Sequence, residues 1–102
     1  MVFEWRFYSS GQQMTTNITN DELLDLLKYE ITIDEDGTKS WRVNGRLHRD
    51  NDLPAIEFAG GTKYWYINGE LHRANGPAIE WADGSKDWYL NDNFIRAEIV
   101  KW

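Results

Sequence analysis

The sequence predicts an α+β protein, in which an antiparallel β-meander of repeated hairpins carries one N-terminal amphipathic helix packed on it. Three observations lead to this fold class. A phrase that begins Trp41-Arg-Val-Asn-Gly-Arg-Leu-His-Arg recurs from Trp65 and, in degraded form, from Trp88, at spacings of 24 and 23 residues. Turn signals alternate with short runs of aromatic and β-branched residues, and one stretch near the N-terminus has helical periodicity. A fixed period of this length is typical of stacked or meandering repeat folds.

The N-terminal part predicts one strand and then the helix. Residues 2–8 alternate apolar and polar side chains, which is the pattern of a half-buried strand. A helix is predicted over residues 19–29, because Thr19 can cap its first turn with Glu22 three residues later. Its buried stripe would consist of Leu23, Leu24, Leu26 and Leu27.

From residue 30 onward the sequence predicts six or seven short antiparallel strands. The first is Glu30–Ile33. Asn-Gly between β-rich runs is the strongest short hairpin signal, because both central residues of a type I′ turn need positive φ. One set of predicted turns contains Asp36-Gly37, Gly60-Gly61 and Asp83-Gly84, and a second set contains Asn44-Gly45, Asn68-Gly69 and Asn91-Asp92.

Size and composition limit the class of protein. A chain of 102 residues is long enough for a single domain with its own core. We divide it into residues 1–35, with the strand, helix and acidic segment, and residues 36–102, with three hairpin repeats of 23–24 residues. The absence of cysteine excludes disulfides and thiolate metal sites. No membrane-spanning run or secretory signal pattern is present, so we expect a cytoplasmic protein.

The negative charge is concentrated in one segment. The net charge is −6, and residues 21–36 alone hold seven acids against one lysine, which leaves ten acids and ten bases elsewhere. This distribution argues against binding to nucleic acid or anionic lipid. It favours a partner protein with a basic surface. The candidate contact residues of this segment are Asp21, Glu22, Asp25, Asp34, Glu35 and Asp36.

The two histidines occupy equivalent positions and are interpreted as structural. A two-residue turn places Trp65 opposite His72, and the same count places Trp41 opposite His48 and Trp88 opposite Ile95. A position that accepts isoleucine is a packing position, with the imidazole lying on the indole. The alternative is general acid–base chemistry by His48 or His72 in a small hydrolase.

Other charged residues also have structural interpretations. Arg49, Arg73 and Arg96 follow these positions in all three copies. We expect the first two to form ion pairs with Glu57 and Glu80, although a row of arginines could also bind an acidic partner. Asp34-Glu-Asp-Gly resembles the opening of a calcium loop but lacks its later glutamate, so we interpret it as a turn whose acids solvate the backbone, without a metal.

The aromatic residues fall into two sets on opposite sides of the predicted strands. The repeated tryptophans are expected to form a buried ladder. Tyr64, Tyr66 and Tyr89, with Arg42, lie on the other side and form a candidate contact patch, because aromatic residues and arginine are enriched at protein interfaces. Alternatively, the leucine stripe of the helix covers part of this patch.

The unit Trp-Tyr-x-Asn-Gly-x-Leu-His-Arg-x-Asn-Gly-Pro-Ala-Ile-Glu-Trp, at Trp65–Trp81, resembles a degenerate MORN-type repeat, of the variant common in small phage and large-virus proteins. The resemblance covers residues 36–98. It implies β-hairpins stacked side by side that act as a scaffold for protein contacts, with lipid binding in some members. This chain departs from the pattern in its acidic N-terminus, its decayed third copy and the replacement of glycine by Asp52-Leu53 before Pro54.

Together these features predict a non-enzymatic protein-binding module without catalytic residues, metal or cofactor. The resemblance and the acidity suggest a phage-type inhibitor of a host defence or nucleic-acid-handling protein, similar to an anti-CRISPR. Its partner would be a protein with a basic surface, such as a CRISPR effector or another nuclease complex. The alternative is a structural repeat scaffold that self-associates through an uncapped C-terminal edge strand, so the chain is expected as a monomer or a dimer.

Overall fold

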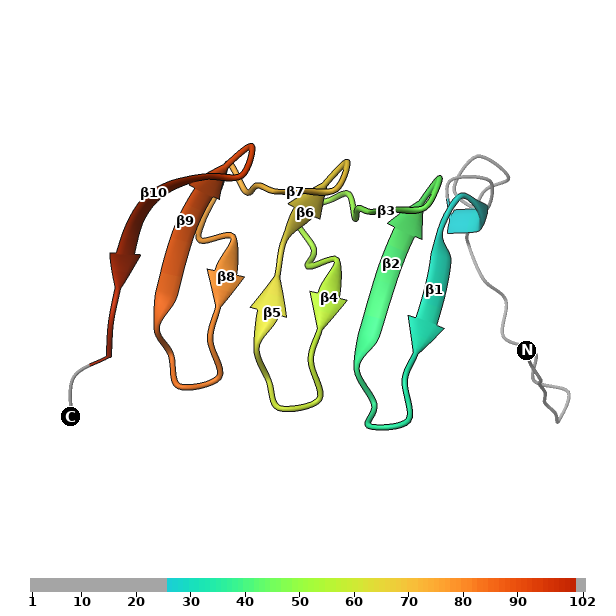
Figure 1. The fold of residues 1–102 in the computed structure, drawn as a ribbon, viewed down its shortest axis with the longest axis horizontal. Coiled ribbons are helices and arrows are strands. Elements are labelled where there is room, and N and C mark those ends of the chain that lie inside the picture. Colours follow the sequence, from blue (N-terminus) through green and yellow to red (C-terminus); the bar gives the residue numbers. More distant parts are fainter. Residues whose placement is uncertain (1–25, 101–102) are drawn as a thin grey trace, which may run out of the picture.

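The computed structural model describes residues 26–100, which form an open antiparallel β-sheet (Figure 1). The main sheet has the strand order β1-β2-β4-β5-β8-β9-β10 with β3 beside β2, and β6 pairs with β7 alone. The strands are β1 (Glu30–Ile33), β2 (Lys39–Val43), β3 (Arg46–Leu47), β4 (Ile56–Glu57), β5 (Lys63–Tyr64), β6 (Tyr66–Ile67), β7 (Glu70–Leu71), β8 (Ile79–Glu80), β9 (Lys86–Leu90) and β10 (Asn93–Glu98). The predicted antiparallel β-meander is confirmed.

The predicted N-terminal elements lie mostly outside the described residues. This applies to the strand at residues 2–8 and to the helix at residues 19–29 except its end. Leu26 and Leu27 have a helical backbone, and a turn follows at Lys28. Within residues 26–100 the structure contains no helix long and apolar enough to cross a membrane.

The structure has more strands than predicted, in part because one predicted strand is divided into two strands with different pairing partners. Residues 63–67 form one predicted strand, but the lower half, β5, pairs with β4 and β8 of the main sheet. The upper half, β6, pairs instead with β7, the return strand of its own hairpin. The predicted register of this hairpin is confirmed, with Tyr66 opposite Leu71 and Ile67 opposite Glu70.

The two predicted sets of turns lie at opposite edges of the sheet (Figure 1). In the Asn-Gly set both central residues have positive φ, as a type I′ turn requires: 52° and 81° at Asn44-Gly45, 51° and 84° at Asn68-Gly69, and 49° and 68° at Asn91-Asp92. The other set, here called the lower turns, comprises residues 34–38, 58–62 and 81–85. Each lower turn closes with the same two backbone hydrogen bonds, 2.9 Å long.

The small core is a row of alternating tryptophans and alanines, together with Ile79, which is 5% exposed and faces Tyr64. Ala55 accepts a hydrogen bond from the Trp41 N–H at 2.8 Å and, by the register of β4 and β5, lies between Trp41 and Trp65. Ala78 occupies the same position one repeat later and accepts from Trp65 at 2.7 Å. Both alanines are fully buried, whereas Trp41 is 9% and Trp65 6% exposed. Alanine is required between neighbouring indoles because a larger side chain would push them apart.

Neighbouring hairpins are also joined through the hydroxyl groups of their lower turns. Thr38 Oγ1 accepts a hydrogen bond from Ala59 N–H of the next turn, and Thr62 Oγ1 accepts from Ala82 N–H, both at 3.1 Å. Ser85 Oγ repeats the contact with Val100 N–H at 3.1 Å. These bonds recur at the period of the sequence repeat and hold the turns in one row.

After its turn, the degraded third copy continues as a single long strand, β10, which pairs along the edge of β9. The strand β10 replaces both the short return strand and the strand after proline, so Glu98 faces Lys86 as Glu80 faces Lys63. Ile95 was predicted to lie opposite Trp88, and this is wrong. The register shifts between Phe94 and Arg96, so Arg96 faces Trp88. The bulge brings Arg96 to the indole without the loop that the first two copies use.

Candidate functional site

The two sides of the sheet carry different side chains. We call the side that bears Trp41, Trp65 and Trp88 the indole face, and the opposite side, with Tyr64, Tyr66 and Tyr89, the tyrosine face. The predicted ladder of buried tryptophans is confirmed for the first two, while Trp88 is partly exposed.

On the indole face an arginine lies over each tryptophan. The guanidinium carbon is 3.7 Å from the ring centroid for Arg49 and Trp41, 4.0 Å for Arg73 and Trp65, and 3.9 Å for Arg96 and Trp88. The predicted pairing of each histidine with its tryptophan is confirmed, because the His48 N–H donates to Trp41 O at 3.0 Å and the His72 N–H to Trp65 O at 3.1 Å. The group found over each indole, however, is an arginine and not the predicted imidazole. Guanidinium is planar and weakly hydrated, so it stacks on an indole more favourably than the smaller imidazole.

The same arginines form the predicted ion pairs. Arg49 Nη1 is 3.2 Å from Glu57 Oε2, and Arg73 Nη1 is 3.0 Å from Glu80 Oε2. Each guanidinium also donates to the carbonyl oxygen of the proline in its own loop, Pro54 at 3.1 Å and Pro77 at 3.2 Å. These arginines therefore hold the repeats together, and their charge is largely neutralised within the fold.

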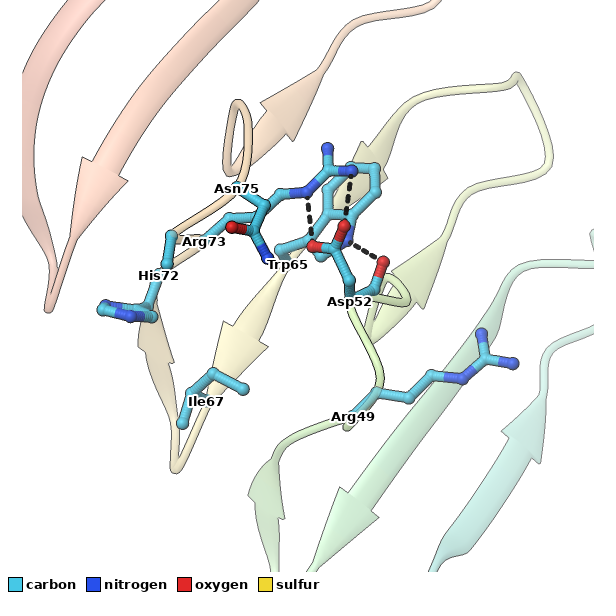
Figure 2. Close-up of a pocket in the computed structure, with 8 residues that line it drawn as sticks. Arg49, Asp52, Trp65, Ile67, His72, Arg73 and Asn75 are labelled. Carbon is cyan, nitrogen blue, oxygen red and sulfur yellow. Dashed lines mark hydrogen bonds and ion pairs between the residues drawn. The ribbon is translucent and has the colours of Figure 1, made fainter.

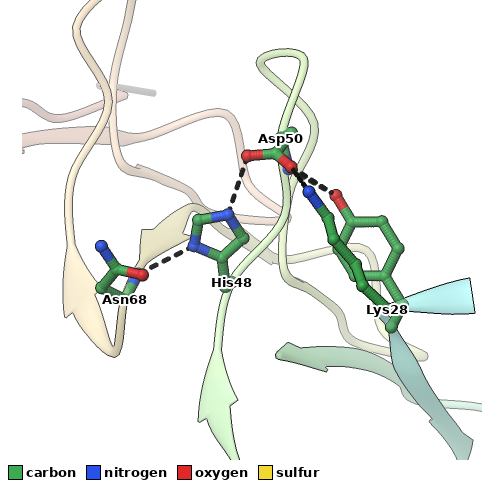
Figure 3. Close-up of polar contacts among 5 residues, drawn as sticks. Lys28, His48, Asp50 and Asn68 are labelled. Carbon is green, nitrogen blue, oxygen red and sulfur yellow. Dashed lines mark hydrogen bonds and ion pairs between the residues drawn. The ribbon is translucent and has the colours of Figure 1, made fainter. Parts of the chain in front are cut away.

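Each histidine accepts a hydrogen bond from the next hairpin. His48 Nδ1 accepts from the Asn68 N–H at 3.0 Å (Figure 3). His72 Nδ1 accepts from the Asn91 N–H at the same distance. His48 Nε2 is 2.7 Å from Asp50 Oδ1. Both ring nitrogens of His48 are thus used inside the fold, which leaves neither for proton transfer to a substrate. The position equivalent to Asp50 is Ala74 in the next copy.

Asp50 ties the segment before β1 to the repeats. Its carboxylate accepts hydrogen bonds from Lys28 Nζ and, at 3.1 Å, from the Tyr29 hydroxyl, which in turn accepts from the Asp50 N–H at 3.0 Å. The bond from Lys28 has the largest effect on the pKa of Asp50; burial opposes it, and the bonds from His48 and Tyr29 add to it, so that the pKa is lowered to about 2. Asp50 is therefore ionised at neutral pH. We call the cluster of Lys28, Tyr29, His48 and Asp50 the clasp, because it holds the segment before β1 against the repeats.

A polar cleft opens on the indole face beside this cluster (Figure 2). Arg73 crosses it to Asp52, with Nε to Oδ1 at 2.8 Å and Nη2 to Oδ2 at 3.3 Å. The Trp65 indole N–H donates to the Asp52 carbonyl oxygen at 3.0 Å. Arg49 is paired with Glu57 and Arg73 with Asp52 and Glu80, so each arginine and aspartate that lines the cleft is already engaged in an ion pair.

The tyrosine face carries an apolar cleft with aromatic walls, lined by Phe58, Thr62, Tyr64 and Trp81. The Phe58 and Tyr64 ring centroids are 5.0 Å apart at an interplanar angle of 70°, and those of Tyr64 and Trp81 are 6.0 Å apart at 80°. Phe58 follows β4 and Trp81 follows β8, the two neighbours of β5. The outer rings therefore stand at a steep angle to Tyr64, one on each side. We call this set the aromatic cleft.

Two residues of the aromatic cleft, Phe58 and Trp81, were missed by the sequence analysis. Strand alternation could have identified them, because Phe58 is two residues after Ile56, which pairs with Tyr64. Trp81 bears the same relation to Ile79 on the next hairpin. Both side chains are still more than one third exposed, at 36% and 39%. Exposed aromatic side chains grouped in this way are typical of contact surfaces.

The predicted acidic residues that the structure describes lie beside this cleft. Asp34, Glu35 and Asp36 form the first lower turn, which contacts the second through the bond from Ala59 N–H to Thr38. Asp36 Oδ1 accepts the Thr38 N–H at 2.9 Å, and this bond lowers the pKa of Asp36. The interpretation of this segment as a turn solvated by its own acid is confirmed. Asp21, Glu22 and Asp25 lie outside the described residues.

The three predicted tyrosines are brought together only in part. Tyr64 and Tyr66 are neighbours, with ring centroids 6.2 Å apart. Tyr89 lies one hairpin further on and packs against Phe94 at 5.6 Å. Arg42, which was expected to border the patch, donates to Ser40 Oγ on its own strand at 3.2 Å. The candidate site is therefore the aromatic cleft with the first lower turn.

Among residues 26–100 no group of three or more histidine, aspartate or glutamate side chains is arranged to hold a metal ion. Comparison with known proteins adds no assignment: no family model, curated protein or solved structure matches this chain.

Proposed function

We propose that this chain is a non-enzymatic protein-binding module whose contact surface is the aromatic cleft together with the acidic first lower turn. The observation that carries the proposal is the exposure of Phe58 and Trp81 on either side of Tyr64. In a fold with so small a core these rings would add stability if they were buried. Their retention at the surface favours a role in recognition.

The indole face supports a structural role for the residues that suggested catalysis. His48 has both nitrogens engaged, and the arginines are paired with carboxylates. The hairpin stacking through recurrent contacts supports a MORN-like arrangement, for which protein scaffolding is the expected activity. Fold alone does not determine function, so the proposal depends on the cleft and its charge.

The expected partner is a protein with a basic surface. Glu35 and the adjacent acids of the first lower turn project negative charge next to the apolar cleft, and the chain has a net charge of −6. Such a surface attracts a basic protein at long range, and the aromatic rings then provide contact area. A nucleic-acid-handling protein of a phage host, such as a CRISPR effector or another nuclease complex, has this character.

Affinity capture with a matched pair of charge reversals tests this proposal. Glu35 and Glu70 are both exposed, and within residues 26–100 neither makes an ion pair or hydrogen bond through its side chain. Glu35→Lys and Glu70→Lys therefore change the net charge equally, but only the first is next to the cleft. The immobilised protein is exposed to bacterial lysate, and captured proteins are identified by mass spectrometry. We expect Glu70→Lys to retain a captured basic protein that Glu35→Lys loses; equal capture by both variants would contradict the proposal.

A second candidate function is self-association through β10. Within the described residues β10 pairs only with β9, and all six of its residues are exposed, including Phe94 at 57% and Ile95 at 54%. An exposed strand edge can pair with a second chain. Light scattering of the purified protein separates the two candidates, because a monomer at all concentrations is inconsistent with a self-assembling scaffold.

A further inference from the structure

We propose that the aromatic cleft binds the guanidinium group of an arginine side chain presented by the partner protein. This inference rests on the proposed function and specifies the group that is recognised. It is carried by the geometry of the three rings, by the charge around them and by the way in which the fold itself places arginine on tryptophan.

The rings provide the surface that a planar cation prefers. A cation over an aromatic face is attracted by the negative potential of the ring, and guanidinium can also stack on it. Phe58 and Trp81 stand at 70° and 80° to the Tyr64 ring. A side chain that approaches this face from solvent therefore meets three neighbouring aromatic rings packed edge to face. The long aliphatic part of an arginine would pack against the same apolar walls.

The Trp81 ring is the most favourable of the three for a cation. Its indole N–H donates to Asp87 Oδ2 at 3.0 Å. A hydrogen bond to a carboxylate increases the electron density of the indole, which strengthens its attraction for a cation. Trp81 thus connects the apolar cleft to a fixed negative charge on β9.

Carboxylates flank the cleft in the turns on both sides. Asp36 lies in the preceding lower turn and Asp83 in the following one. Each accepts a backbone N–H two residues later, Asp36 from Thr38 and Asp83 from Ser85, and these bonds lower the pKa of both acids. Both acids are therefore ionised at neutral pH. They favour a cationic ligand over a neutral aromatic one.

The fold itself places arginine on its repeated tryptophans, and the one other cation–ring contact in the described part of the chain, Lys28 over Tyr29, is longer at 5.3 Å. In residues 26–100 the three repeated tryptophans each carry an arginine within 4.0 Å of the ring centroid. The rings of the aromatic cleft carry no such cation from within this part of the chain. The cleft therefore presents, on the opposite face, the same kind of surface without its arginine.

The test measures the binding of three labelled hexapeptides by fluorescence anisotropy at 0.15 M salt. The peptides contain six arginines, six lysines or six citrullines, the last being a neutral isostere of arginine. Purely electrostatic attraction would bind the arginine and lysine peptides equally. We expect the arginine peptide to bind about five- to tenfold more tightly than the lysine peptide, and the citrulline peptide not to bind.

Two tyrosine variants localise the binding. Tyr64→Ser introduces the residue that β2 carries at the equivalent position, Ser40, which faces Ile56 as Tyr64 does, so we expect the strand to tolerate it. Tyr89→Ser removes a tyrosine of the same face outside the cleft. We expect Tyr64→Ser to weaken the arginine peptide about fivefold or more and Tyr89→Ser to change it less than twofold. In parallel, the Trp81 indole N–H signal in a ¹H–¹⁵N NMR spectrum should shift on addition of N-acetyl-argininamide.

Three outcomes would overturn the inference: equal affinity for the arginine and lysine peptides, equal effects of Tyr64→Ser and Tyr89→Ser, or no measurable binding of the arginine peptide. None of them decides the proposed function, because capture of a basic protein that depends on Glu35 and not on Glu70 would still support a protein-binding module with a different mode of recognition. Conversely, arginine binding without any captured protein would confirm the cleft and contradict the module.

Discussion

At the scale of single residues, the hydrogen bonds of the repeated Leu-His pair explain why this pair recurs together with Asn-Gly in the sequence. Leu47 O accepts the Gly69 N–H at 2.8 Å, and His48 Nδ1 accepts the Asn68 N–H at 3.0 Å. The backbone donors of each tight turn are thus satisfied by the preceding copy. His72 repeats the contact one hairpin later. A histidine that recurs once per repeat has a structural reason to do so.

Replacement of His72 tests this acceptor. His72→Leu removes the acceptor of the Asn91 N–H, and we expect a loss of about 1 kcal/mol in the free energy of unfolding. His72→Asn can place its side-chain oxygen where Nδ1 lies, so it should lose less. Urea unfolding of the two variants measures the difference. If the asparagine variant were no more stable than the leucine variant, the hydrogen bond would not be the reason for histidine here.

The clasp at Asp50 predicts a specific pH dependence. Its pKa is lowered from 3.8 to about 2 in the folded protein, so its contribution to stability is complete above about pH 4 and is lost as the pH falls toward 2. Asp50→Asn removes this contribution. We therefore expect wild type to be the more stable protein at pH 6 and the difference to shrink between pH 4 and pH 2. A difference that stays constant over this range would refute the assignment.

At the scale of elements, the Asn-Gly turns depend on their backbone conformation. Gly69 has a φ of 84°, and a Cβ built there would meet nothing closer than Arg46 at 3.7 Å. Gly60 lies in open space without a positive φ, which makes it a matched control. We expect Gly69→Ala to cost about 1–2 kcal/mol through left-handed strain, and Gly60→Ala to be neutral or slightly stabilising. Thermal unfolding distinguishes them, and equal melting temperatures would contradict the turn assignment.

The sequence was sufficient for strands and turns because their signals are local. The positive φ at Asn68-Gly69 and the hairpin register follow directly from the dipeptide and its spacing. The register shift between Phe94 and Arg96 could not be predicted from the turn, because counting from a two-residue turn assumes a regular ladder, and here the shift places Arg96 opposite Trp88. Pairwise counting from a turn fails wherever a bulge interrupts the regular ladder.

The same limit applies to the candidate site. The acidic turn and Tyr64 could be identified from composition and alternation. Their association with Phe58 and Trp81 depends on which hairpins lie side by side, and that order is a property of the whole sheet. The sequence also could not show that arginine, and not histidine, lies over the indoles. This placement depends on loops that return Arg49 and Arg73 to their own tryptophans.

At the scale of the whole molecule, the two faces of the sheet have separate roles. The indole face joins the hairpins through buried tryptophans, alanines, arginines and carboxylates. The tyrosine face keeps its aromatic rings partly exposed and adjoins the acidic turn. Tyr64 and Trp65 are neighbours in sequence but lie on opposite faces, with Trp65 6% exposed. We therefore assign recognition to Tyr64 and stability to Trp65.

The most direct measurement of this division is the free energy of unfolding of two variants, Tyr64→Ser and Trp65→Ala, in one urea series. The account expects Trp65→Ala to lose about 3–5 kcal/mol, because it removes a buried indole and leaves a cavity. Tyr64→Ser should lose only about 0.5–1.5 kcal/mol, the value of its contacts with the neighbouring rings. If Tyr64→Ser proved the more damaging change, the tyrosine face would be the core and the aromatic cleft could not serve as a contact surface.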